Sequence, residues 1–451
     1  MITLKGLEGA KKFVYERGSF AVSEQVSDTI MHRIKDLFGR AMTPYEAVAN
    51  IIQEIRVQGD EAVRKFSYLI DGVSLDTAEV SISELKAARD LVSRDLVDAL
   101  EFSAQRVHDF ASTALPRSWY NADTGLGEMV VPIDFVGMYV PGGTAAYPST
   151  LIMTALTAKA AGVKKLLMCT PPRKDGKVLP VIAAAAHVAG VDQVFSVGGA
   201  QAIAAMAFGT ASMPRVDKIC GPGNIFVTLA KQQLYGKVGI DGIYGPTETV
   251  VVADDSTDPR FVAADLIAQA EHDLLATPIL VTTSPALIDR VASEMERQIC
   301  TMQRKEIIKA SLEGQGTNIL VKDLEEAIEV ANLIAPEHLC LMFEGPSVWL
   351  DKVRNAGTVF VGEGTPEATG DYVAGPSHTI PTQGSARFSS YLGVDQFLKK
   401  VPVVSLSVEE VERIAPADST IARAEGLTAH ASAIEMRITN TDLKSEREKS
   451  L

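Results

Sequence analysis

Two side chains near the end of one apolar segment have the types and the spacing of metal ligands. The segment, Phe261–Asp273, carries apolar residues at helical spacing, and Pro259 just before it is typical of a helix start. On a helix, Gln269 and His272 leave the same face, with Cβ atoms about 5–6 Å apart. An amide oxygen and an imidazole at that spacing can both reach one metal ion through bonds of about 2.0–2.2 Å. The pattern therefore indicates two ligands of a metal site.

A metal site needs more ligands, and three other segments could supply them: Pro336–His338, Gly370–Tyr372 and Gly426–His430. The alternative is that a Gln-x-x-His pair at a helix end forms a polar surface or a capping cluster. The scarcity of histidine favours the metal. The chain has seven histidines in 451 residues, and four of them stand beside carboxylates, glycines or other candidate ligands: His272, His338, His378 and His430.

Length and composition describe an ordinary globular protein of more than one domain. A chain of 451 residues exceeds the limit of about 250–300 residues for a single core. Hydrophobic residues make up 46% and charged residues 22%, which is typical of soluble proteins. The net charge of −14 argues against nucleic acid or an anionic membrane as a partner.

Nothing in the sequence indicates export or membrane insertion. The first residues contain no uninterrupted apolar core, so a secretory signal is not expected. The most apolar stretch, 149–163, is broken by Lys159 and is too short to span a bilayer. The four cysteines show no CxxC spacing and are typical of reduced, buried thiols. We therefore expect a cytoplasmic protein.

The N-terminal part is predicted to be a helical layer. Residues 1–34 carry no strong pattern, whereas Thr43 and Glu46 around Pro44 form a capping-box signal. Further helices are expected at about 60–70, 83–92 and 94–112. The last of these is expected to present Leu96, Leu100, Val107 and Phe110 to a core.

From about residue 128, apolar runs alternate with helical segments, which indicates βαβ units and parallel sheets. The expected strands of the first series are Phe135–Val140, Lys165–Cys169, Gln193–Val197 and Val216–Cys220. Those of the second series are Thr249–Val252, Ile279–Thr282, Asn318–Val321, Leu339–Met342 and Thr358–Val361. Beyond about 392 the pattern returns to helix, at Val408–Ile414 and Ile421–Glu425, followed by an apolar-polar segment, Ala433–Ile438. Residues 441–451 are charged and expected to fray.

Four glycine-containing loops lie where a parallel sheet would bind ligands, outside the carboxyl ends of its strands. They are Tyr139–Thr144, Gly198–Gln201, Gly221–Asn224 and Tyr244–Glu248. Glycine permits close backbone approach, and the helices that follow favour anionic groups such as pyrophosphate. The alternative is that these are tight βα turns. A full GxGxxG, a P-loop and a GxSxG motif are all missing from the sequence, which weakens the case for phosphoryl transfer and serine hydrolysis.

Several longer strings together resemble the histidinol dehydrogenase family. They are GMYVPGGTAAYPS, VGGAQAIAAMAFGT, VDKICGPGN, AQAEHD, APEHL, ATGDY, GPSHTIPTQGSARFSS and EGLTAH, in family order from about residue 40 to 438. The resemblance implies a zinc site, with one ion per subunit, at Gln269, His272, Asp371 and His430. It implies a catalytic pair, Glu337 and His338. It implies NAD contacts at Tyr139, Gln201 and Asn224. It implies substrate contacts at Thr247, His338, Glu367, His378 and Glu425 besides the metal ligands.

The resemblance also implies a fold: an α/β protein with two incomplete Rossmann-like parallel-sheet domains, small helical N- and C-terminal domains and an intertwined homodimer. In that scheme 1–34 is a small N-terminal segment. Residues 35–137 with 247–391 form a discontinuous domain that carries most of the metal and catalytic site. Residues 138–246 form a second, NAD-contacting domain. Residues 392–451 form a dimerisation domain that brings Glu425 and His430 into the partner's site.

By this resemblance the reaction is oxidation of L-histidinol to L-histidine, with two NAD⁺ reduced and water consumed. His338 could take the hydroxyl proton near neutral pH. Glu337 could activate the water if burial raises its pKa from about 4.3. The metal would position the amine and imidazole of the substrate, and Glu425 would accept a hydrogen bond from the far imidazole nitrogen. Without the resemblance, Glu337-His338 after a proline is typical of a surface turn.

Three positions depart from the family pattern: Thr247 where serine is commoner, Ser377 where asparagine is frequent, and Ala111 where a histidine often stands. They fit ordinary variation, or a related enzyme for another alcohol such as a sulfonated diol. The same metal ligands would also suit a zinc hydrolase, or a zinc- or nucleotide-binding protein without catalytic activity. Glu337 and His338 are both present, which argues against the binding protein.

Overall fold

The computed structural model describes residues 1–18, 28–75, 77–142 and 146–439. The chain divides into two compact units. The first comprises Met1–Leu115 and Ile133–Phe397, and the second comprises Pro116–Pro132 and Leu398–Leu451. The first unit contains two six-stranded sheets, and the second contains a three-stranded sheet.

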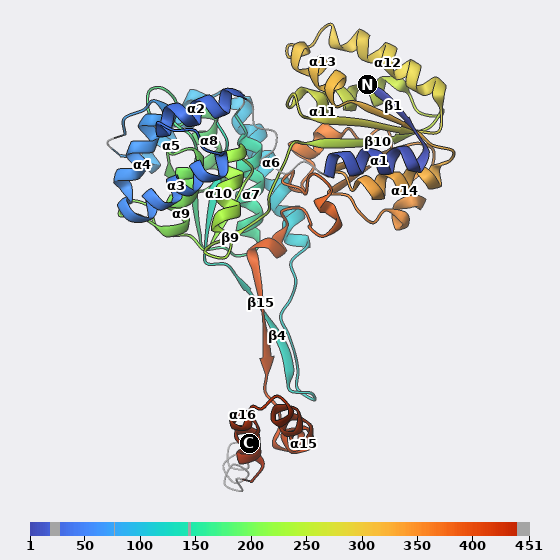
Figure 1. The fold of residues 1–451 in the computed structure, drawn as a ribbon. Coiled ribbons are helices and arrows are strands. Elements are labelled where there is room, and N and C mark those ends of the chain that lie inside the picture. The colour runs from blue at the N-terminus through green and yellow to red at the C-terminus, as the bar shows by residue number, and fades with distance from the viewer. Residues whose placement is uncertain (19–27, 76, 143–145, 440–451) are drawn as a thin grey trace. The chain divides into compact units, whose positions relative to one another are not determined.

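The first sheet has the strand order β2-β7-β6-β5-β8-β9, and its edge strand β9 is labelled in Figure 1. Its strands are β2 (Glu79–Val80), β5 (Phe135–Tyr139), β6 (Lys165–Cys169), β7 (Gln193–Phe195), β8 (Lys218–Cys220) and β9 (Gly239–Ile240). All pairings are parallel except that of β2 with β7. The connecting helices are α7 (Pro148–Ala160), α8 (Pro180–Ala189), α9 (Gly199–Phe208) and α10 (Ile225–Leu234). The predicted alternation of strands and helices is therefore present here.

The N-terminal helices pack mainly against the helices that connect the strands of this first sheet. They are α2 (Asp28–Phe38), α3 (Pro44–Gln58), α4 (Asp60–Phe66), α5 (Ile82–Ala88) and α6 (Arg94–Thr113), and α2 packs against α3. Helix α3 begins with the predicted capping box of Thr43 and Glu46. Its residues Val48, Ile51 and Ile55 are buried in one cluster with the alanines of α9 and with α10.

One expected core residue of α6 is not in the core. Leu100 and Val107 are buried as predicted, but Phe110 is 40% exposed and Val97 is buried in the same helix. Phe110 instead lies with its ring 6.2 Å from that of Tyr391. The buried face of α6 is therefore narrower at its C-terminal end than the apolar pattern predicts.

The second sheet is fully parallel, in the order β1-β12-β11-β10-β13-β14. Its strands are β1 (Ile2–Lys5), β10 (Glu248–Ala253), β11 (Thr277–Thr282), β12 (Thr317–Leu320), β13 (His338–Met342) and β14 (Thr358–Val361). Both faces are covered, because Val251 packs in one apolar cluster while Val250 and Val252 pack in another. The first cluster contains residues of α11 (Pro259–Glu271), α12 (Pro285–Ile299) and α13 (Lys305–Gly314), and the second contains residues of α1 (Gly6–Gly18) and α14 (Leu324–Ile334).

Strand pairing groups the chain differently from the predicted domains. The prediction joins 35–137 to 247–391, but α3 packs against α9 and α10, and β2 pairs with β7 of the first sheet. It also sets the segment 1–34 apart, but β1 adds an edge strand to the second sheet beside β12. These groupings depend on contacts between distant segments, which local periodicity does not encode.

The second unit combines two distant stretches. Its antiparallel sheet pairs β15 (Leu398–Val404) with β4 (Leu126–Pro132), which also pairs with β3 (Trp119–Asn121). Two helices follow, α15 (Val408–Ala424) and α16 (Thr428–Thr439). The two expected helical pieces form one continuous helix, α15, with Pro416 inside it, and the apolar-polar segment Ala433–Ile438 is part of α16. Among the described residues, no helix combines the length and apolar character that a bilayer crossing requires.

We expect Ile51→Ala to cost about 2–5 kcal/mol in the free energy of unfolding, because it leaves a cavity between α3 and the alanines of α9. Val57 is 70% exposed on the same helix, so Val57→Ala serves as the matched control and should change stability by less than about 0.5 kcal/mol. Urea unfolding followed by circular dichroism measures both. Equal midpoints for the two variants would contradict the packing of α3 described above.

Candidate active site at the amino edge of the second sheet

The predicted catalytic and substrate residues gather at the amino ends of neighbouring strands. Glu337 precedes β13 and His338 begins it, while Thr247 stands just before β10. Gln269 and His272 come from the C-terminal end of α11. The Tyr244–Glu248 loop is predicted at a carboxyl edge, yet it leads from β9 of the first sheet into the amino end of β10. The general rule for parallel sheets therefore holds for Gly198–Gln201, for Gly221–Asn224 and for the described part of Tyr139–Thr144, whose last two residues lie outside the described ranges, but not for this site.

Glu337 and His338 are both buried, with exposed fractions of 7% and 5%. Glu337 Oε2 accepts hydrogen bonds from Thr247 Oγ1 and from the backbone N–H of Glu248, the latter at 3.0 Å. His338 Nδ1 lies 3.3 Å from Glu367 Oε1. The two adjacent side chains thus have separate partners, and a surface turn does not describe them.

Burial shifts the two pKa values in opposite directions. It raises the pKa of Glu337 to about 8, against the hydrogen bonds from Thr247 and Glu248 that lower it. It lowers the pKa of His338 to about 4, an effect that the charge of Asp371 opposes. Near neutral pH the pair therefore consists of a carboxylic acid and a neutral imidazole. A neutral imidazole can accept a proton, as a general base must.

A chain of hydrogen bonds connects the pair to Gln269. The Nε2 of Gln269 donates to Thr247 Oγ1 at 3.0 Å, and Thr249 Oγ1 lies 2.9 Å from Gln269 Oε1 and 2.6 Å from Glu367 Oε1. A hydroxyl has one hydrogen, so Thr249 donates to one of the two at a time. Burial raises the pKa of Glu367 well above its ordinary value. A protonated Glu367 can donate to Thr249, which leaves the hydrogen of Thr249 for Gln269.

Thr249 is a site residue that the sequence motifs do not identify. It is fully buried and stands two positions after Thr247, so the alternation along β10 aims both side chains to the same face. The sequence signal that could have identified Thr249 is the alternation Thr-Glu-Thr at residues 247–249, where the strand starts. Glu367 lies against Thr249 and His338, and its predicted contact with substrate stays a prediction.

A second group of donors surrounds Asp371. Its Oδ2 lies 3.7 Å from His272 Nε2 and its Oδ1 lies 3.6 Å from His378 Nδ1. His378 is held from its other side by Thr150 of α7, with Nε2 and Oγ1 2.8 Å apart. Burial raises the pKa of Asp371, but the hydrogen bond from His378 and the charges of the neighbouring histidines outweigh it and leave the pKa below its ordinary value. The carboxylate is therefore ionised, as a metal ligand must be.

These donors fit a zinc ion. Around a tetrahedral ion with bonds of about 2.1 Å, neighbouring donors are about 3.4 Å apart, which is close to the 3.7 Å between His272 and Asp371. The oxygen of Gln269 has two lone pairs, so it can accept from Thr249 and bind an ion as well. His430 and Glu425 belong to the second unit, where both side chains are exposed, so their part in the site stays a prediction.

The predicted NAD contacts lie at or just beyond the carboxyl ends of strands in the first sheet. Tyr139 ends β5, and its hydroxyl accepts from the backbone N–H of Gly199 at 3.1 Å. Asn224 follows β8 and caps α10 with its side-chain oxygen, which leaves only its amide nitrogen for a ligand. Gln201 is fully buried at the start of α9.

These residues also fit the cofactor. Gln201 Oε1 has no hydrogen-bond partner among the described residues, although Nε2 donates to Asp71 at 3.3 Å. Gly198 at the N-cap of α9 has no side chain, and the hydroxyl of Tyr139 accepts from the first N–H of the helix, that of Gly199. A buried acceptor without a donor, close to a helix N-terminus, is what a bound nucleotide can satisfy.

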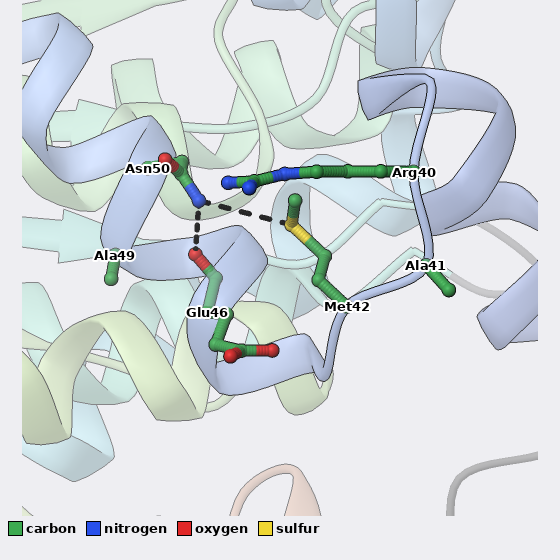
Figure 2. Close-up of a pocket in the computed structure, with 6 residues that line it drawn as sticks. All are labelled: Arg40, Ala41, Met42, Glu46, Ala49 and Asn50. Atoms are coloured by element: carbon green, nitrogen blue, oxygen red, sulfur yellow. Dashed lines mark hydrogen bonds between the residues drawn. The ribbon is translucent and has the colours of Figure 1, made fainter.

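Two other features belong to neither donor set. Asp265, Cys340 and Glu367 place their ligand atoms within 4.8 Å of one another, so they too could hold an ion. Burial raises the pKa of all three groups, which favours their neutral forms. Figure 2 shows a hollow of about 240 Å³ around Arg40, Met42, Glu46 and Asn50 at the start of α3, and none of the predicted site residues lines it.

The fold and this arrangement define a two-sheet α/β protein with a buried acid–imidazole pair beside metal-type donors. The family described as Histidinol dehydrogenase matches residues 40–438. The chain belongs to the histidinol dehydrogenase family.

Relatives cover most of its length. Histidinol dehydrogenase from Dehalococcoides mccartyi is 47% identical over 396 residues, which is 88% of this chain and 91% of that one. Histidinol dehydrogenase from Thermus thermophilus is 48% identical over 397 residues, covering 88% and 95%. The crystal structure of histidinol dehydrogenase from Elizabethkingia anophelis matches with a TM-score of 0.88 at 33% identity, covering 97% of this chain and 98% of that one.

We expect Thr249→Val to destabilise the protein by about 1–3 kcal/mol, because it leaves the buried oxygens of Gln269 and Glu367 facing a methyl group. Thr249→Ser keeps the hydroxyl and is the matched control, with a smaller loss expected. The free energy of unfolding in urea distinguishes the two. A valine variant as stable as the serine variant would show that the hydroxyl does not bridge these groups.

Proposed function

We propose that this chain oxidises L-histidinol to L-histidine through the aldehyde, using NAD and one zinc ion per subunit, in the last steps of histidine biosynthesis. Family membership over residues 40–438 supports the substrate. The observation that carries the proposal is the buried Glu337–His338 pair with oppositely shifted pKa values. An alcohol oxidation needs a proton acceptor, and conversion of an aldehyde to an acid needs an activated water.

His338 is the base for the hydroxyl proton. Its pKa of about 4 keeps the imidazole neutral, and Nδ1 faces Glu367, so Nε2 is the nitrogen left for substrate. Glu337 acts on the water that adds to the aldehyde. Its pKa of about 8 places its proton exchange close to neutral pH. Thr247 has the same hydroxyl group as the serine that is commoner at this position in the family. This hydroxyl donates a hydrogen bond to Glu337.

Gln269, His272 and Asp371, with His430 of the partner subunit, would hold the zinc. When bound, the ion fixes the amine and imidazole of the substrate, and NAD⁺ accepts a hydride in each of the two oxidations. Tyr139, Gln201 and Asn224 contact NAD at the carboxyl edge of the first sheet. His378 and Glu425 bind the substrate. Glu367, by its contacts, supports His338.

The proposed active form is an intertwined homodimer in which the C-terminal unit of one chain completes the site of the other. The second unit supports this proposal, because it exposes the apolar side chains of Ile421 on α15, Met436 on α16 and Leu427 between the two helices. Exposed apolar residues of this kind are typical of protein–protein contact. We place the enzyme in the cytoplasm, where its cofactor and product are used.

Purified enzyme should reduce two NAD⁺ per histidine formed, measured as NADH absorbance with product quantified separately. As a control, His338→Ala should lower kcat by about 10²–10⁴-fold and retain its zinc. NADH formation from another alcohol, such as a sulfonated diol, but not from histidinol would make the chain a related dehydrogenase for that alcohol. Hydrolysis without NADH, or no turnover of any alcohol, would overturn the proposal.

His272→Ala should remove most of the bound zinc, because it deletes one ligand from the set around Asp371. His32→Ala is the matched control: this histidine is exposed on α2, and its Nδ1 lies 2.8 Å from the backbone oxygen of Asp28. Metal content by elemental analysis after dialysis measures both variants. Full zinc in His272→Ala would contradict the proposed ligand set whatever the activity.

A further inference from the structure

A buried lysine–aspartate pair lies directly behind the loop Gly221–Asn224. Lys231 of α10 is 2% exposed and Asp241, just after β9, is 0% exposed at the side chain. Their charged groups are hydrogen-bonded to each other. Neither residue is among the predicted catalytic, metal, substrate or cofactor residues.

The pair is hydrogen-bonded to both backbone polar groups of Gly221, its N–H and its carbonyl oxygen. Lys231 Nζ donates to the carbonyl oxygen of Gly221 at 3.0 Å, and the N–H of Gly221 donates to Asp241 Oδ2 at 2.7 Å. Gly221 has a φ of +113°, and a Cβ at this position would lie 2.1 Å from the carbonyl oxygen of Tyr139. The backbone therefore passes close to Tyr139 in a conformation that only glycine adopts readily, and the ion pair fixes it there.

Gly221 is the first residue of a loop at the carboxyl edge of the first sheet, where the NAD contacts are predicted. Gly221 follows β8 immediately and precedes Asn224, whose oxygen is committed to the cap of α10. Asp241 also accepts from the N–H of Gly242 at 2.8 Å, at the start of the segment that leads to Thr247. The lysine–aspartate pair therefore holds the first residue of the short loop that ends at Asn224.

A buried ion pair is weak evidence for a role in stability. Removing two charges from water costs more than their attraction returns unless the geometry is good, and apolar replacements of buried ion pairs are often neutral or stabilising. We infer that Lys231 and Asp241 are positioning residues for the dinucleotide, which hold the Gly221–Asn224 loop in its binding conformation. The inference rests on the proposed NAD-linked function.

Lys218 provides a matched control within the same sheet. It is also a buried lysine, 7% exposed, and stands on β8 three positions before Gly221. Its Nζ donates to the backbone and side-chain oxygens of Gln396 instead of to the loop. Loss of Lys218 should therefore reveal the cost of deleting a buried lysine without loosening the loop.

The test measures NADH binding by fluorescence and Tm for Lys231→Met, for the double variant Lys231→Met with Asp241→Asn, and for Lys218→Met. We expect Lys231→Met to weaken NADH binding by about tenfold or more, since it removes a charged hydrogen bond to the loop. The double variant should recover Tm, because no charge is left unpaired, yet keep the weakened binding. Lys218→Met should lower Tm and leave NADH affinity unchanged.

Two results would overturn the inference: unchanged NADH affinity in Lys231→Met, or affinity that returns with Tm in the double variant. Wild-type protein that fails to bind NADH would overturn the proposed function as well. Wild-type binding with an unaffected Lys231→Met would overturn only the positioning role.

Discussion

The register between β10 and β13 is the constraint on which the rest of the site depends. Parallel pairing sets Thr249 beside His338 at the amino ends of the two strands. A slip of one residue would turn Thr249 to the other face of the sheet and remove the bridge between Gln269 and Glu367. Apolar residues on both faces, among them Val250 and Val251, prevent such a slip because each belongs to a different core.

That same burial supplies the acid–base chemistry. A charged carboxylate next to a charged imidazole would be costly in this interior, whereas a protonated Glu337 and a neutral His338 are not. Because of this cost, the pKa of Glu337 is raised to about 8 and that of His338 is lowered to about 4. Exclusion of water thus keeps the imidazole in its unprotonated form, which is the form that can accept a proton.

Much of this could be predicted from the sequence, and the failures have one cause. Capping at Thr43, the parallel strands and the glycine-containing loops are local patterns, and the family motifs identified the family. The pairing of β1 with β12 and the packing of α3 on the first sheet depend on distant segments. Thr249 escapes prediction because a buried threonine in a strand is indistinguishable from core until its neighbours across the sheet are known. The contacts of Glu367 with Thr249 and His338 likewise join segments that are far apart in the sequence.

The predicted NAD contacts lie near the N-termini of helices on the first sheet, and the predicted metal ligands lie near the C-terminus of a helix on the second. The two ends of a helix favour ligands of opposite charge. On the first sheet, helices begin at the carboxyl edge, and the start of α9 presents the positive end of a helix dipole, which suits the phosphates of a dinucleotide. On the second sheet, Gln269 and His272 lie at the end of α11, where the dipole is negative and a divalent cation is stabilised. An anionic cofactor and a cationic metal therefore have different favourable edges. Residues 241–247 connect them, running from β9 at the first edge to β10 at the second, with Asp241 anchoring one end and Thr247 bonded to Glu337 at the other.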